Sequence, residues 1–249
     1  MPLALVRYPH RPDTGLPEPL TAVAIWAIAS TLRRDLFDGL AVHPVPASTL
    51  AAAARDLVVN DRHITLCWDL GHVVHDDAGN PVLGVCESDP DSPGQAFISL
   101  DAGLVAASDD LAASTAAHEL GHAVFDIPAT LPTSERPGRR YRAALVAETY
   151  LSEPDRRSEY WSEFRANELM GAFLAPPTLL HAQLLKHARD AGLALVHRQH
   201  LGRRGFPVVR AGRHGDAITG ITAALAGDFG VSERFISVRL ARYRLITSG

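Results

Sequence analysis

Two patterns of apolar residues alternate along the chain, and together they predict an α+β fold. Helical spacing over Leu20–Phe37 and an alanine-rich run over Thr49–Val58 predict two early helices. Segments rich in β-forming residues then predict three strands: His63–His75, Val82–Glu87 and Ala96–Leu100. From Ser108 onward helical spacing dominates almost to the end of the chain. We therefore expect a small mixed β-sheet packed on a helical core.

Prolines and glycines divide this pattern into parts. Pro44 and Pro46 separate an N-terminal arm and helix, 1–45, from a main domain expected over 46–190. A last helical segment is expected over 205–249. Within the helical part, four stretches are expected to break the helices: Thr130–Arg140, Glu153–Ser158, Pro176-Pro177 and Gly202–Gly215.

Composition places the chain among ordinary globular proteins. It has 249 residues, of which 47% are hydrophobic and 21% charged, and its net charge is -4, although the C-terminal fifth is basic. Cys67 and Cys86 are its two cysteines, so a disulfide scaffold is not expected. The apolar run Leu20–Ala29 is too short to span a bilayer. These features predict a cytoplasmic protein that does not bind membranes.

The segment HELGH at 118–122 carries the strongest chemical signal. Residues four apart lie on one face of a helix, so His118 and His122 can point ring nitrogens at one ion at ~2.0–2.1 Å. Glu119 lies beside them and could act as general base, because a catalytic zinc ion lowers the pKa of its bound water to roughly 7. This is the chemistry of amide hydrolysis. The alternative is a pair of surface histidines on an amphipathic helix.

The helix that carries HELGH is predicted to be buried. Ser108 is a suitable N-cap, and Asp109 and Asp110 place negative charge in the first turn, where the helix dipole favours it. Apolar residues occupy both of its sides. Gly121 lowers helix propensity by about 1 kcal/mol relative to alanine, so we expect it to allow close packing.

A catalytic zinc site needs a third protein ligand, and Glu163 is the best candidate. The continuation typical of metzincins is excluded, because Phe125 and Pro128 stand where it has glycine and histidine. The helix expected over Tyr160–Leu174 places Glu163 on an apolar face, and acids are seldom buried without a partner or a metal. The alternative for Glu163 is a partly buried salt bridge.

The neighbours of Glu163 on this helix have separate expected roles. Asn167, one turn later, could hydrogen-bond the outer nitrogen of a ligand histidine and fix its tautomer. Arg165 and Glu168 fall on the opposite side and are expected to be solvated.

In combination, HELGH at 118–122 and EFRANELMGAFLAPP at 163–177 resemble the ImmA/IrrE family of metallopeptidases, whose pattern is HExxH followed by a helix of the type ExxANxFAxxLLMP. The resemblance implies a zincin-like core, Glu163 as third ligand and Glu119 as base. Zinc is the expected cofactor, with manganese as the alternative. The implied substrate is a helix-turn-helix repressor of the XRE type, cleaved under stress or during mobile-element induction.

The chain also departs from that family pattern. Leu169-Met170 replace its Phe-Ala pair, and Ala175 replaces its methionine. The interval from the HELGH segment to Glu163 is longer and holds an apparent insertion at 130–158, with a helix expected around Tyr141–Leu151. Glu148 on this helix is a rival metal ligand. The insertion is expected either to gate the cleft or to be a passive surface segment.

Within the segment 205–249, the ending LAGDFGVSERFISVRLARYRLI at 225–246 resembles the closing helix-turn-helix of the same family. Gly230-Val231 followed by Ser232 forms a turn and N-cap. The outer face of the last helix, with Arg234 and Arg242, could bind a protein, remain solvated or, as the less favoured alternative, bind DNA. Further arginines upstream raise the local charge or mark a loop: Arg198, Arg203, Arg204, Arg210 and Arg213.

Three functions remain open at this point. The favoured one is an endopeptidase whose extended substrate pairs with Ala96–Leu100 as edge strand. The second is a zinc-stabilised DNA-binding regulator without turnover, against which Glu119 argues, because a closed structural site needs no base. The third is a deformylase-type amidase with Cys86 as ligand, although a small buried cysteine is the simpler interpretation.

Overall fold

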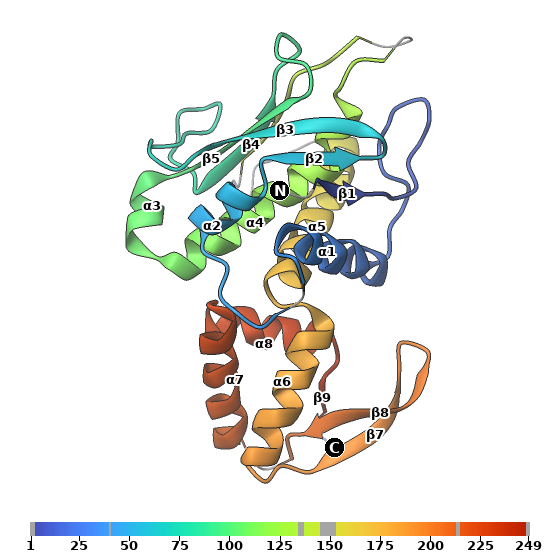
Figure 1. Cartoon of the computed structure of the whole chain (residues 1–249), viewed down its shortest axis with the longest axis vertical. Helices are drawn as coiled ribbons and strands as arrows, with labels where there is room; N and C mark the ends of the chain where they lie inside the picture. The colour runs from blue at the N-terminus through green and yellow to red at the C-terminus, as the bar shows by residue number, and fades with distance from the viewer. Residues whose placement is uncertain (1–2, 40, 134–136, 145–152, 213–214, 248–249) are drawn as a thin grey trace. The chain divides into compact units, whose positions relative to one another are not determined.

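Figure 1 shows the computed structural model of the chain, which describes residues 3–39, 41–133, 137–144, 153–212 and 215–247. The chain forms two compact units. Unit 1 comprises Met1–Leu40 and Val45–Phe173, and unit 2 comprises Ala41–Pro44 and Leu174–Gly249. This division differs from the expected domains 46–190 and 205–249, because the structure places residues 174–204 with the C-terminal part. The α+β class is confirmed.

Unit 1 contains a six-stranded mixed sheet in the order β1-β2-β3-β5-β4-β6. Its strands are β1 (Ala4–Val6), β2 (Asp56–Val59), β3 (Arg62–Asp69), β4 (Gly84–Ser88), β5 (Gln95–Leu100) and β6 (Tyr141–Ala144). The pairs β1–β2 and β3–β5 are parallel, and the other pairs are antiparallel. The expectation that Ala96–Leu100 is an edge strand is therefore wrong. Strand β5 lies in the interior of the sheet because it pairs with both β3 and β4.

One face of this sheet is covered by helices. Along β3 and β5, buried residues such as Ile64 and Ile98 alternate with part-exposed residues such as Thr65 and Phe97, as expected of strands with a single buried face. Helix α4 (Asp109–Phe125) packs against β4 and β5 and runs beneath the sheet in Figure 1. Every residue from Thr115 to Phe125 is buried, so the helix is enclosed as predicted.

Local features fix the start of α4 and its contact with α5 (Glu153–Leu174). The Ser108 hydroxyl accepts a hydrogen bond from the Leu111 amide at 3.4 Å, which confirms the predicted N-cap. A Cβ added to Gly121 would lie 2.7 Å from Cα of Ala166 on α5, so the two helices approach each other at a position where only glycine fits. The packing role predicted for Gly121 is confirmed.

Helix α1 (Ala22–Leu36) forms hydrogen bonds with the C-terminal half of α5. Trp26 Nε1 donates to Glu168 Oε2 at 2.5 Å, and Arg33 donates to the Phe173 carbonyl at 2.9 Å. Burial lowers the pKa of the Arg33 guanidinium to about 10. Glu168 is buried, so the expectation that it is solvated is wrong. Its partner lies 142 residues earlier, beyond the reach of any pattern within α5.

The segment expected to be an insertion contributes to the sheet. Tyr141–Ala144 is strand β6, paired with β4, rather than the start of a helix, and residues 145–152 lie outside the described residues. Helix α5 begins at Glu153, so the expected break at Glu153–Ser158 is also wrong. The remaining short helices of unit 1 are α2 (Ala47–Ala53), α3 (Ala102–Ala107) and the 3-10 turn η1 (Ile127–Ala129).

Unit 2 combines three helices with a three-stranded sheet. The helices are α6 (Pro177–Asp190), α7 (Gly215–Phe229) and α8 (Glu233–Arg242), and the strands are β7 (Leu195–His200), β8 (Arg203–Arg210) and β9 (Ile246–Thr247). Apolar residues such as Leu184, Val209 and Leu225 form its core. The Ser232 hydroxyl accepts from the Phe235 amide at 3.1 Å, which confirms the turn and cap between α7 and α8. The β7–β8 hairpin was not expected from the sequence.

In the described ranges, no helix is both long enough and apolar enough to cross a membrane.

Candidate metal centre

Three side chains of unit 1 converge where α4 meets α5. His118 and His122, one turn apart on α4, have their Nε2 atoms 3.1 Å apart. Glu163 of α5 places Oε2 at 3.4 Å from His118 Nε2 and Oε1 at 3.2 Å from His122 Nε2. Both histidine side chains are buried, whereas that of Glu163 is 32% exposed. The cluster is therefore accessible to solvent on the side of Glu163.

The separations between these atoms fit a tetrahedral metal ion. Ligand atoms at 2.0–2.1 Å from zinc lie about 3.3–3.4 Å apart at the tetrahedral angle. The three measured distances are close to this value. Two imidazoles and one carboxylate are also a ligand set of catalytic zinc sites, which keep a fourth position open. The structure thus brings together the three residues predicted as ligands, in a group that could hold a metal ion.

Glu119 is fully buried next to the two histidines. Neither of its carboxylate oxygens has a hydrogen-bond partner within the described part of the chain. Burial raises the pKa of Glu119. A Cβ added to Gly84 of β4 would lie 3.0 Å from Glu119 Oε1, so the absence of a side chain at Gly84 leaves room for this carboxylate. A buried carboxylate is normally paired, and an unpaired one beside a metal-ligating cluster is available to a substrate or a water molecule.

Asp126 holds the outer nitrogen of His122. Its Oδ2 lies 3.0 Å from His122 Nδ1, and a carboxylate behind a ligand histidine fixes the ring's tautomer and orientation. The sequence suggested Asn167 for this role. The Asn167 amide instead donates to the backbone carbonyl of Glu163 at 2.8 Å. Asp126 follows His122 by one helical turn, and this spacing was the signal that could have identified it.

Three further donors converge on Asp126. Tyr141 Oη and Ser162 Oγ donate to Oδ2 at 3.0 and 2.6 Å, and Arg165 donates to Oδ1 at 2.7 Å. Burial would raise the pKa of Asp126, but the hydrogen bond to His122 and the charges of His122 and Arg165 lower it to about 2. The expectation that Arg165 is solvated is wrong, because its side chain is 12% exposed and ion-paired. No local pattern indicates Tyr141, which reaches the site only through the pairing of β6 with β4.

The two rival ligands have different outcomes. Cys86 is fully buried in β4, where burial raises the pKa of its thiol. Among the described residues, the metal-ligating group at this site comprises His118, His122 and Glu163 without Cys86. Cys86 is therefore a small buried core side chain, in line with the simpler interpretation of its sequence. Glu148, the other rival, lies outside the described residues.

Three aromatic side chains pack together on α5, and one of them, Tyr160, lies next to Glu163 on the helix surface. The ring centroids of Tyr160, Trp161 and Phe164 lie 5.3 to 6.4 Å apart. Tyr160 is 61% exposed and Trp161 is 45% exposed. Because Tyr160 precedes Glu163 by three residues, the two side chains are neighbours on the helix surface. The site therefore has apolar surface beside its accessible edge.

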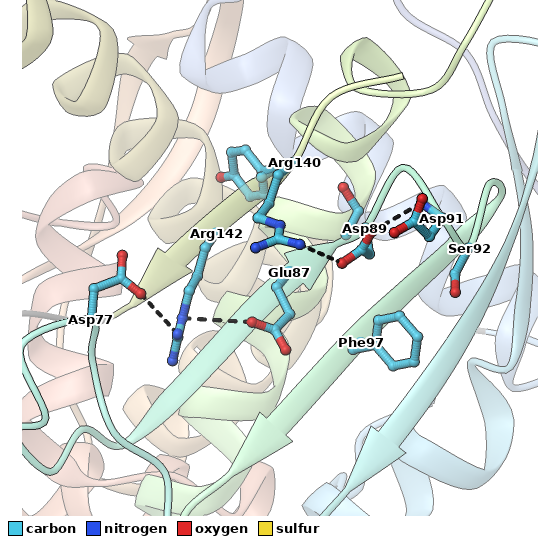
Figure 2. A pocket seen from close by; sticks show the side chains of 10 residues that line it. Asp77, Glu87, Asp89, Asp91, Ser92, Phe97, Arg140 and Arg142 are labelled. Atoms are coloured by element: carbon cyan, nitrogen blue, oxygen red, sulfur yellow. Dashed lines mark hydrogen bonds and ion pairs between the residues drawn. The ribbon is translucent and has the colours of Figure 1, made fainter. Parts of the chain in front are cut away.

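A separate cavity of about 530 Å³ lies on the other face of the sheet, and Figure 2 shows its lining. Glu87 and Phe97 are cross-strand partners that alternate with the buried pair Cys86 and Ile98, so they point away from α4. Arg142 lies between Asp77 and Glu87, with which it pairs at 2.8 and 3.5 Å. Arg140 pairs with Asp89 at 2.9 Å. Arginines thus offset much of the acidity of this cavity, and it contributes no ligand to the metal centre.

No family model, curated protein or solved structure matches the chain, so the interpretation of the site depends on its own geometry.

Proposed function

We propose that this chain is a zinc-dependent endopeptidase. The observation that supports this most directly is the buried, unpaired carboxylate of Glu119 beside the group formed by His118, His122 and Glu163. A structural zinc site closes with four protein ligands and has no use for such a carboxylate. A hydrolytic site requires one, because a proton must leave the attacking water and reach the leaving amine.

Each residue then has a defined role. His118, His122 and Glu163 would hold the ion. A bound zinc ion supplies Lewis acidity, which polarises the scissile carbonyl and lowers the pKa of an attacking water to roughly 7. Glu119 accepts the proton of that water on a carboxylate oxygen and later donates it to the amide nitrogen that leaves. Asp126 keeps Nε2 of His122 directed at the site through its bond to Nδ1.

The substrate in this proposal is an extended segment of a protein. Strand β6 is one of the two edge strands of the sheet within the described ranges, and Oη of its first residue, Tyr141, lies 3.2 Å from His122 Nδ1. An extended peptide that paired with β6 would pass close to the metal centre. The exposed ring of Tyr160, three residues before Glu163 on α5, would contact its apolar side chains. The resemblance to ImmA/IrrE peptidases suggests an XRE-type repressor as the protein that is cleaved.

The test is incubation of the purified chain and zinc chloride with a purified XRE-type repressor. We expect a new repressor fragment from the wild-type chain. Glu119→Gln should retain zinc but lose roughly 10²–10⁴-fold in cleavage rate, because only the proton acceptor is removed. Near-normal turnover by Glu119→Gln would exclude the general-base role. A zinc-loaded wild-type chain that cleaves neither this repressor nor an unfolded test protein would refute the peptidase proposal.

A further inference from the structure

Unit 2 carries a strong excess of positive charge. Residues 174–249 contain eleven Lys and Arg but four Asp and Glu, a net charge of +7 in a chain whose total is -4. Residues 41–44, the other part of the unit, add no charged side chain apart from His43. A dense local excess of this kind attracts polyanions.

Part of this charge lies on the β7–β8 hairpin, which projects from the helices of unit 2 in Figure 1. Arg198, Arg203 and Arg204 are exposed on it, and within the described part of the chain none of the three forms an ion pair or hydrogen bond through its side chain. Because adjacent residues of a strand point to opposite faces, Arg203 and Arg204 place one charge on each face.

The base of the hairpin is held firmly. The ring of Phe206 is stacked between His181 of α6 and His200 of β7, with both centroid distances 4.2 Å. His181 Nε2 bonds the Pro207 carbonyl at 2.7 Å, and His200 Nε2 bonds the Tyr243 carbonyl at 2.6 Å. The hairpin is therefore anchored to the helical part of its unit, and its arginines do not need to be ordered from a disordered loop on binding.

The tip of the hairpin holds an apolar side chain in an unfavourable backbone conformation. Leu201 and Gly202 form the turn, with φ values of 46° and 81°. Asn or Gly is preferred at the first of these positions, and leucine there is strained. Leu201 is also 54% exposed. A strained, exposed leucine at a projecting tip suggests a contact surface, since neither the turn nor the core of the unit requires it.

We propose that the β7–β8 hairpin is an arm that binds duplex nucleic acid, with its arginines on the phosphodiester backbone and Leu201 against the groove surface. Two-stranded ribbons fit nucleic-acid grooves, and apolar side chains can pack against the sugars and base edges there. This inference does not depend on the proposed peptidase activity. The proposed contact with nucleic acid is the exposed hairpin, whereas the sequence indicated the outer face of α8 as the possible DNA contact.

The test measures binding of the full chain to a fluorescent 20-base-pair DNA duplex by anisotropy between about 50 and 200 mM salt. We expect binding that weakens steeply with salt. Replacing Arg198, Arg203 and Arg204 by alanine should weaken binding about tenfold or more at low salt. It should also reduce the slope of log affinity against log salt by about 0.9 for each phosphate that is no longer neutralised. Parallel measurements with duplex RNA and with single-stranded DNA identify which type of nucleic acid is preferred.

A charge-matched control distinguishes binding through the hairpin arginines from binding that depends only on the positive charge of unit 2. Replacing Arg189, Arg234 and Arg244 by alanine removes the same charge from exposed positions elsewhere in unit 2. This variant should weaken binding less than the triple variant of the hairpin does. Leu201→Asn should raise the melting temperature, because asparagine tolerates positive φ, and yet weaken duplex binding. Absence of duplex binding at 50 mM salt would overturn the proposal, as would equal losses from the two triple variants or unchanged binding by Leu201→Asn.

Discussion

Units 1 and 2 use their charged side chains in opposite ways. Unit 1 contains 24 Asp and Glu against thirteen Lys and Arg, a net charge of -11. Behind the metal-ligating histidines, the buried Asp126 is paired with Arg165, whereas Glu119 is buried and unpaired within the described residues. The hairpin arginines of unit 2 are exposed, and the described residues offer them no ion pair. Buried pairs fix the geometry of a site, whereas exposed unpaired charges remain available to a partner.

The largest expected effect is the loss of the metal ion from unit 1. Glu163→Ala removes one of three ligands, so zinc content should fall from about one ion per chain to near zero, with loss of any hydrolysis. Metal analysis after dialysis measures this. Asn167→Ala, one turn later on the same exposed side of α5, is the matched control and should keep its zinc. Full zinc content in Glu163→Ala would show that the ion, if bound, lies elsewhere.

Whether the sequence predicts a residue of this site depends on how far apart along the chain that residue and its partners lie. His118, Glu119 and His122 lie in one helical turn, and their spacing alone indicates the chemistry. Glu163 was the best candidate for a third ligand because of its place on an apolar helix face, and the resemblance of a second segment supported it. The network behind them was missed because Tyr141 reaches the site through strand pairing and Arg165 through a helix crossing. Such contacts follow from tertiary structure and leave no periodic signal in the sequence.

A smaller effect is expected from the residue that orients His122. Asp126→Asn keeps the shape of the side chain but removes its charge, and loss of a carboxylate behind a ligand histidine typically weakens metal binding by roughly 10–100-fold. Competition with a zinc chelator measures the affinity. Ser162→Ala removes one donor to Asp126 and leaves the carboxylate in place, so its loss should be smaller. Unchanged zinc affinity in a folded Asp126→Asn chain would show that Asp126 is only a structural ion-pair partner of Arg165.

The fold was predictable in its elements more than in their arrangement. Helix α4, its cap at Ser108 and the packing role of Gly121 follow from local rules, and the structure confirms them. The order of the strands does not follow from such rules. Strand β5 became interior because β3 pairs with it in parallel, and the β7–β8 hairpin has Leu201 where a typical hairpin turn has asparagine or glycine. Both features depend on pairing between segments that local propensity does not encode.

The smallest expected effect compares two helical glycines, one from each unit. In an open helix position, alanine stabilises relative to glycine by about 1 kcal/mol. Gly220 of α7 is such a position, because nothing lies within 4 Å of an added Cβ, so Gly220→Ala should stabilise unit 2 by up to that amount. Gly121→Ala should have the opposite sign. Its Cβ would lie 2.7 Å from the Ala166 backbone, and overpacking of this kind typically costs about 1–3 kcal/mol.

Denaturant unfolding of the two variants, followed with zinc present and after chelation, measures both signs. Because the contact of Gly121 with Ala166 sets the approach of the ligand-bearing helices, Gly121→Ala should also lower zinc affinity, whereas Gly220→Ala should leave it unchanged. Stabilisation of the chain by Gly121→Ala would mean that α4 and α5 can separate at little cost. The close crossing of these helices would then not be what holds Glu163 against the two histidines.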